Sequence, residues 1–221
     1  MPRSTDASST PPPKPGRSKR RRAYHHGDLR QALVDSARAL LAEGGPAALT
    51  LRAAARDAGV SQTAPYRHFA SREDMLTAVA EDGFRRLHAR MRAAVAPQRG
   101  KRALQQLAVE YVRFALEQPA EYRIMFGREA AALEQTSAGA ALAKSSAAVM
   151  DLLQGGIEEM QRSGVIRAGD PAVMALAAWS LVHGLVMLTL DGQGSRTRDK
   201  PIDILVRDVT SLLMTGMAAS G

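Results

Sequence analysis

Residues 50–69 read TLRAAARDAGVSQTAPYRHF and predict two short helices joined by a tight turn. Thr50 is a residue type that caps helix N-termini, and small apolar residues follow it at helical spacing. Gly59 stands where the chain must leave the first helix, because glycine adopts the left-handed backbone at little cost. Ser61 is expected to cap the second helix by accepting a backbone N–H of its first turn. The pattern is typical of a helix-turn-helix, whose second helix enters the major groove of DNA.

The flanking sequence extends this motif to a DNA-binding domain over residues 25–92. A helix over about residues 28–43 precedes the motif and is expected to end at Gly44-Gly45-Pro46. A longer helix begins at Ser71, with Asp74 as its capping-box partner, and its apolar positions continue almost to Pro97. We expect this long helix to connect the two domains.

Residues 93–221 predict a second helical domain. Five further helices are expected, over residues 104–114, after Pro119, over residues 138–161 with a kink at Gly155-Gly156, from Asp170-Pro171, and from Pro201. The helix from Pro171 carries one apolar stripe, formed by Met174, Ala177, Leu181, Leu185 and Leu188. No strand pattern competes, so the predicted fold class is all-α with about nine helices.

Composition narrows the class further. The chain of 221 residues has 45% hydrophobic but only 4% aromatic residues, which predicts a core of Ala, Leu, Val and Met. Cysteine is absent, which excludes disulfides and thiolate chemistry and suits a reducing cytoplasm. No apolar run is expected to approach the roughly 20 residues that span a bilayer, and the first 24 residues lack the apolar segment of a secretory signal.

The excess positive charge lies beside the helix-turn-helix. Residues 1–24 carry seven Lys or Arg against one Asp, residues 25–95 carry a net charge of +2, and residues 96–221 are neutral. Residues 1–24 are also rich in Pro and Ser, which predicts a disordered basic arm that attracts DNA. A solvated tail without a partner is the alternative interpretation.

The chain resembles the tetracycline-repressor-like (TetR) family of bacterial transcriptional regulators. The resemblance lies in residues 50–61, in Pro65, Tyr66, His68 and Phe69, and in the helix start at residues 71–76. It departs from the family at Ala54, where Ile or Val is usual. The family resemblance implies a three-helix DNA-binding domain followed by a larger domain that dimerises and binds an effector. Residues 119–126 and 178–192 also resemble a TetR subgroup whose ligand-binding domain has the signature of Trp179, His183 and Gly184.

Two kinds of DNA contact are expected. Gln62, Thr63, Ala64 and Arg67 face base edges, since Gln pairs with adenine, Arg with guanine, and small methyls touch thymine. Thr50 and Arg52, at the start of the preceding helix, are expected to contact phosphates. The family resemblance implies further phosphate contacts by Tyr66, His68 and Arg72. Phe69 is expected in the core, Tyr66 is a phosphate or core residue, and Arg67 reads a base or a phosphate. The predicted DNA-binding residues are Thr50, Arg52, Ser61, Gln62, Thr63, Ala64, Tyr66, Arg67, His68 and Arg72.

The second domain is expected to bind a largely apolar small-molecule effector and to form a homodimer. The candidate pocket residues are Tyr111, Phe114, Met125, Phe126, Met150, Trp179 and His183, with plain core packing as the alternative. His183 either bonds the ligand or is a satisfied core histidine. The last two helices, from Pro171 and from Pro201, would pair between two copies as a four-helix bundle. The resemblance implies that the effector releases the operator and lifts repression.

Other classes fit the sequence less well. An enzyme is not expected, since the chain has no phosphate-binding glycine loop and no His-Glu-x-x-His pair. His25, His26 and Asp28 lie close together, but adjacent histidines cannot share a helix face, so no metal site and no cofactor are predicted. An architectural protein that binds DNA by charge alone would not need the neutral, methionine-rich second half. We therefore expect a cytoplasmic DNA-binding regulator with no membrane contact.

Overall fold

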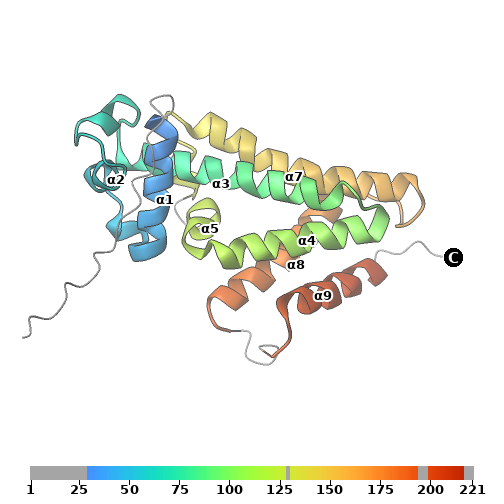
Figure 1. Ribbon diagram of the computed structural model, residues 1–221. Helices are drawn as coiled ribbons and strands as arrows, with labels where there is room; N and C mark the ends of the chain where they lie inside the picture. Colours follow the sequence, from blue (N-terminus) through green and yellow to red (C-terminus); the bar gives the residue numbers. More distant parts are fainter. Residues whose placement is uncertain (1–28, 128–129, 194–198, 217–221) are drawn as a thin grey trace, which may run out of the picture.

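The computed structural model describes residues 29–127, 130–193 and 199–216, and its regular structure in these ranges is helical (Figure 1). The predicted all-α class is confirmed. The basic arm over residues 1–24 and the group of His25, His26 and Asp28 lie outside the described residues. In chain order the helices are α1 (Leu29–Ala48), α2 (Leu51–Asp57), the 3-10 helix η1 (Ala64–Arg67), α3 (Arg72–Val95), α4 (Gly100–Glu117), α5 (Pro119–Phe126), α6 (Ala130–Leu133), α7 (Gly139–Arg162), α8 (Pro171–Leu190) and α9 (Ile202–Gly216).

The predicted helix starts agree with the structure because side-chain oxygens satisfy the first free N–H groups. Thr50, Ser71 and Asp170 each accept a backbone N–H of the first turn, at 3.0, 3.0 and 2.9 Å. The carboxylate of Asp74 accepts the N–H of Ala70 at 3.1 Å, one residue before the expected capping-box position.

Two glycine predictions have different outcomes. Gly45 has φ 65° and interrupts α1 where the helix was expected to end, although the chain resumes a helical turn to Ala48. By contrast, α7 continues through Gly155 and Gly156 as one helix from Gly139 to Arg162, so the glycine pair that was expected to kink the helix does not end it. Helix α4 packs against α7, and a Cβ added at Gly156 would lie only 3.2 Å from the side chain of Leu104 on α4.

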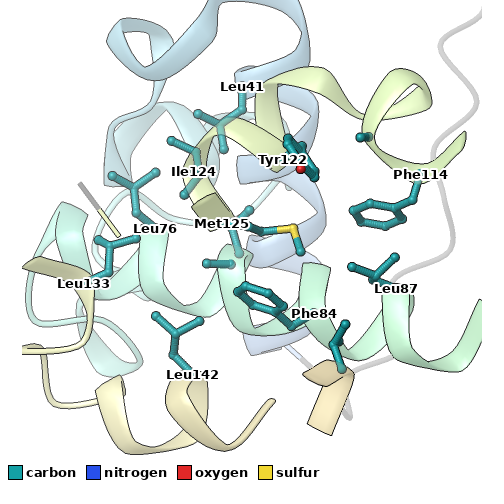
Figure 2. Packing of buried hydrophobic residues seen from close by; sticks show 14 of the residues in the cluster. Leu41, Leu76, Phe84, Leu87, Phe114, Tyr122, Ile124, Met125, Leu133 and Leu142 are labelled. Carbon is teal, nitrogen blue, oxygen red and sulfur yellow. The ribbon is translucent and has the colours of Figure 1, made fainter. Parts of the chain in front are cut away.

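Helix α3 occupies the centre of the molecule and packs against α1, α4, α5 and α7 (Figure 1). Its apolar side chains join those of α1 and α5 in one continuous cluster, in which Leu41, Leu76, Phe84, Ile124 and Met125 lie close together (Figure 2). The N-terminal helices and the C-terminal helices therefore share a packed core. A close-packed interior transmits displacement, so α3 and α5 connect the two halves mechanically.

Helix α8 departs from one expectation. Among the described helices it alone is long and apolar enough to cross a membrane, so the expectation of no such run is wrong by length and composition. The residues of α8 that are buried in the protein core are Met174, Ala175, Ala178, Val182 and Val186. Of the apolar stripe that the sequence indicates on this helix, only Met174 is buried, whereas Ala177 and Leu188 are exposed. Because α8 is apolar all round, periodicity could not select the inner face.

Candidate DNA-binding surface and effector cavity

The turn after α2 has the geometry that its sequence predicts. Gly59 has φ 71°, and its N–H donates to the carbonyl of Arg56 at 3.2 Å. The N–H of Val60 donates to the carbonyl of Ala55 at 2.9 Å, which closes the turn. A Cβ at Gly59 would meet no atom within 4 Å, so backbone conformation rather than space selects glycine.

The second helix of the motif is a single 3-10 turn, and Ser61 does not cap it as expected. The hydroxyl of Ser61 lies 3.2 Å from that of Thr63, while its carbonyl accepts the N–H of Ala64 at 3.0 Å. Pro65 has no N–H and restricts the residue before it. The helix therefore begins only at Ala64, with Thr63 in the cap position and no side-chain hydrogen bond there.

One side of this turn packs against the protein core, and the other side is exposed to solvent. Pro65 and Phe69 are buried, which confirms Phe69 as a core residue, and the N–H of Phe69 donates to the Pro65 carbonyl at 2.9 Å. The guanidinium of Arg30 lies 5.7 Å from the centre of the Phe69 ring. The predicted DNA contacts of this segment therefore lie on a firmly anchored turn. Exposed among them are Ser61, Gln62, Thr63, Tyr66, Arg67 and His68, whereas Ala64 is half-buried.

The predicted phosphate contacts at the two helix starts differ in what they already bind. Arg52 is exposed on the first turn of α2, and Thr50 is exposed although its oxygen caps that helix. Arg72 donates from Nε to the Leu49 carbonyl at 3.0 Å and from Nη2 to the Pro46 carbonyl at 2.6 Å. Arg72 thus ties the α1–α2 connection to the start of α3, a structural role that the sequence pattern did not reveal. Its contact with phosphate stays a prediction.

A cavity of about 430 Å³ lies in the second domain, with walls from α3 to α9. Five of the seven predicted pocket residues line it: Tyr111, Met125, Phe126, Met150 and Trp179. Its wall also includes residues that the sequence could not separate from ordinary core, since they too are apolar at helical spacing. Examples are Phe84, Met91, Leu107 and Met214.

Phe114 and His183 are not part of the cavity wall. Phe114 is fully buried against α3 (Figure 2). The guanidinium groups of Arg86 and Arg90 lie 5.5 and 6.0 Å from its ring centre. His183 is half-buried behind the wall. The spacing rule placed both residues on the right helices but did not fix which side of each helix faces the cavity.

His183 belongs to a hydrogen-bonded group with Tyr111, Tyr122 and Trp179. The indole N–H of Trp179 donates to the Tyr111 hydroxyl at 3.0 Å, and the two tyrosine hydroxyls lie 2.8 Å apart. The Nδ1 of His183 lies 2.7 Å from the Tyr122 hydroxyl and 3.0 Å from that of Tyr111. In one order that uses all three hydrogens of Trp179 and the two tyrosines, the Trp179 N–H donates to Tyr111, Tyr111 to Tyr122, and Tyr122 to Nδ1 of neutral His183.

Burial supports this proton arrangement. Removal from water raises the pKa of Tyr111 and of Tyr122, so both keep their hydroxyl hydrogens. The same removal from water lowers the pKa of His183, which favours the neutral imidazole that this order requires. The interpretation of His183 as a satisfied core histidine therefore fits the geometry better than a ligand contact.

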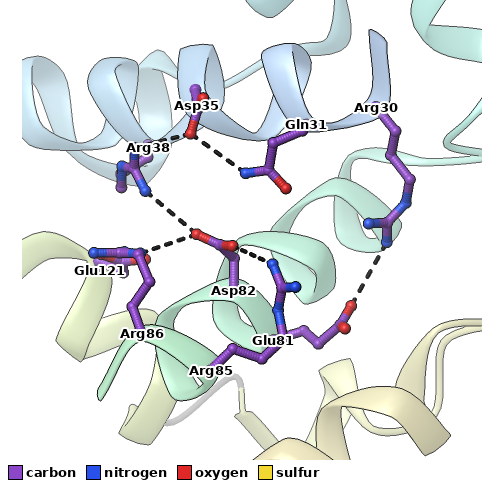
Figure 3. Close-up of polar contacts among 9 residues, drawn as sticks. All are labelled: Arg30, Gln31, Asp35, Arg38, Glu81, Asp82, Arg85, Arg86 and Glu121. Atoms are coloured by element: carbon purple, nitrogen blue, oxygen red, sulfur yellow. Dashed lines mark hydrogen bonds and ion pairs between the residues drawn. The ribbon is translucent and has the colours of Figure 1, made fainter. Parts of the chain in front are cut away.

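An ion-pair network joins α1, α3 and α5 next to the cavity (Figure 3). The buried carboxylate of Asp82 accepts from Arg38 of α1 at 3.3 Å and from Arg86 at 2.9 Å. Arg86 also pairs with Glu121 of α5, which is 2% exposed. Burial raises the pKa of Glu121 even though Arg86 opposes that shift. Since Met125 and Phe126 on the same helix line the cavity, α5 contacts both the cavity and α1.

Comparisons with known proteins cover both halves of the chain. Residues 33–79 match the model of bacterial regulatory proteins of the tetR family, and residues 104–212 match a tetracyclin repressor-like C-terminal domain. No curated protein matches the sequence. A Rhodococcus sp. RHA1 structure described as a protein with unknown function is 34% identical, with a TM-score of 0.77 over 89% of this chain and 99% of that one.

More distant structures share the fold. A TetR family transcription regulator from Marinobacter aquaeolei VT8 is 17% identical, with a TM-score of 0.66 over 86% of this chain and 96% of that one. The transcriptional regulator FadR from Bacillus subtilis, in complex with stearoyl-CoA, is 18% identical, with a TM-score of 0.66 over 85% of this chain and 98% of that one.

Proposed function

The chain belongs to the TetR family of bacterial regulatory proteins, and on this premise we propose that it is a ligand-responsive repressor that binds a palindromic operator as a homodimer. The observation that carries the proposal is the combination of an anchored, exposed helix-turn-helix edge with an apolar cavity joined to it through α3 and α5. A small-molecule effector in the cavity would release the operator. The protein would act in the cytoplasm.

DNA recognition would take place at the exposed edge of η1. Gln62 and Arg67 carry the hydrogen-bonding groups that read adenine and guanine in the major groove, and Thr63 offers a methyl to thymine. Tyr66 is 54% exposed although aromatic, which suits contact with the sugar-phosphate backbone better than core packing. Thr50 and Arg52 would hold the phosphates on the other side. The short helix reads only a few base pairs, so two copies are needed for specificity.

Dimerisation would use α8 and α9. Large apolar side chains stay exposed on both helices: Val173, Leu176, Leu188, Ile204 and Leu212 are 50–76% exposed. Several large apolar side chains exposed on two helices that pack together indicate a protein interface or a membrane contact. We assign it to a second copy of the chain, because pairing these faces forms a four-helix bundle and gives the two-fold symmetry that a palindromic operator requires.

Effector release would follow from the connection between cavity and DNA-binding domain. A ligand that favours one position of α5 shifts the population toward that position. The shift reaches α1 through Arg86, Asp82 and Arg38, and from α1 it reaches the helix-turn-helix through α2, which packs against both α1 and η1. A change in the distance between the two η1 helices of the dimer then weakens binding to an operator whose half-sites are one helical turn apart.

Selection of bound duplexes from a random DNA pool tests this function. We expect an inverted repeat, and Gln62→Ala should relax the preference at one position of each half-site. Arg52→Ala should instead weaken binding to all sequences and lower the salt dependence. An architectural protein that binds by charge alone would enrich no sequence and would lose specific and scrambled DNA together as salt rises.

A further inference from the structure

We propose that the effector is a lipophilic amine, whose apolar body fills the cavity and whose ammonium group pairs with Glu134. The proposal rests on the function proposed above for the claim that the cavity is the effector site. It adds the chemical class of the ligand, which follows from the hydrogen-bonding capacity of the cavity wall.

The body of the cavity accepts an apolar or aromatic group. Phe84, Tyr111, Phe126 and Trp179 line it, and the ring centres of Phe126 and Phe84 are 5.0 Å apart. Methionine side chains also line the cavity, and they adapt to ligands of different shape. Aromatic faces also attract a cation, because their quadrupole is negative above the ring.

The side-chain N–H and O–H groups of the cavity wall already donate to acceptors within the protein. The indole N–H of Trp179 donates to Tyr111, whose hydroxyl is bonded within the tyrosine–histidine group. The hydroxyl of Thr210 donates to a carbonyl of the preceding turn of α9 at 2.7 Å, and that of Ser146 does the same in α7 at 3.0 Å. Among the lining residues that the structure describes, no side-chain N–H or O–H is left for a ligand. A ligand carboxylate or phosphate would therefore lose water without gaining a donor.

The acceptors of the wall, by contrast, are available. Glu134 lines the cavity with an exposed carboxylate, and no Lys, Arg or His in the described ranges lies within ion-pair distance of it. The oxygens of Ser146 and Thr210 each keep a lone pair after donating. The cavity thus combines a negative group at one position with apolar and aromatic surface elsewhere, and this combination fits an amine with a hydrophobic body.

Three probes with one tail and different head groups test the ligand class: decylamine and decanoate, each below its critical micelle concentration, and decanol, below its solubility limit. Trp179 is the only tryptophan of the chain and lies in the cavity wall, so its fluorescence reports binding. At pH 7 the amine is charged and decanoate is anionic. We expect decylamine to bind about fivefold more tightly than decanol, as one partly exposed ion pair allows. Decanoate should bind at least about tenfold more weakly than decylamine.

Two variants identify the residue. Glu134→Gln should remove the advantage of decylamine over decanol and leave decanol binding unchanged. Asp151→Asn removes one exposed negative charge from α7 outside the cavity wall, and it should preserve the advantage. Equal or tighter binding of decanoate, an unchanged amine preference in Glu134→Gln, or the absence of binding by any probe would each overturn the proposal. None of these results would affect sequence-specific operator binding, which is measured separately in the absence of any probe.

Discussion

Replacing Leu212 by Asp should separate the dimer without unfolding the subunit. Leu212 is 76% exposed on α9, so it contributes little to the core of its own chain. In the proposed four-helix bundle, the same side chain would be covered by the partner copy. An Asp at this position would bring an unpaired carboxylate into an apolar contact, which is unfavourable in addition to the lost burial.

The magnitude follows from the exposed area. Complete burial of a Leu side chain is worth about 1.5–3 kcal/mol, so the 76% of Leu212 that is still exposed accounts for roughly 1–2 kcal/mol. A symmetric dimer contains the substitution twice, which raises the loss to roughly 2–4 kcal/mol. The dissociation constant of the dimer should therefore rise about 30- to 700-fold, before the carboxylate is counted.

Sedimentation equilibrium over a range of protein concentrations measures this change, and urea unfolding of the separated subunit checks the fold. Ala143→Asp places the same charge on an exposed position of α7, on the opposite side of the molecule from α9 in Figure 1, and should leave the dimer intact. If Leu212→Asp dimerises as tightly as the unsubstituted protein, the α9 face is not the interface and the assignment of the exposed apolar surface is wrong.

Three further substitutions test the site. Arg72→Ala should lower the free energy of unfolding by about 1–2 kcal/mol, since two hydrogen bonds to backbone carbonyls are lost; an unchanged urea midpoint would leave Arg72 only the role of a phosphate contact. Phe114→Ala should cost about 3–5 kcal/mol in the same assay, because the side chain is fully buried; a smaller loss with altered probe binding would place Phe114 at the cavity instead. Burial lowers the pKa of His183 below its ordinary 6.5, so the unfolded chain binds this proton first, and stability should fall as the pH drops from 7 to 5. His183→Asn keeps an acceptor toward Tyr122 and should remove much of that pH dependence, and an equally steep loss in this variant would contradict the assigned neutral imidazole.

The sequence was most informative where local chemistry decides the structure. The caps at Thr50, Ser71 and Asp170 and the left-handed Gly59 could be predicted because each satisfies a local backbone requirement. The cap at Ser61 failed because Pro65 delays the start of η1, a competition between two local rules.

Properties that depend on packing between distant segments were harder to predict from the sequence. The inner face of α8 could not be read from periodicity, because both of its faces are apolar. The group of Tyr111, Tyr122, Trp179 and His183 brings together three helices, and no spacing within one segment indicates it. Arg72 had a plausible role in DNA binding, and only the fold shows that its guanidinium also holds the α1–α2 connection.

The mass and footprint of the operator complex test the central claim most directly, which is that two copies each present one η1 edge to the same duplex. On a selected inverted repeat, native mass spectrometry should give two chains per duplex, and hydroxyl-radical footprinting should show two protected regions on one face, about 34 Å apart. One chain per duplex, or uniform protection along every DNA offered, would contradict the account.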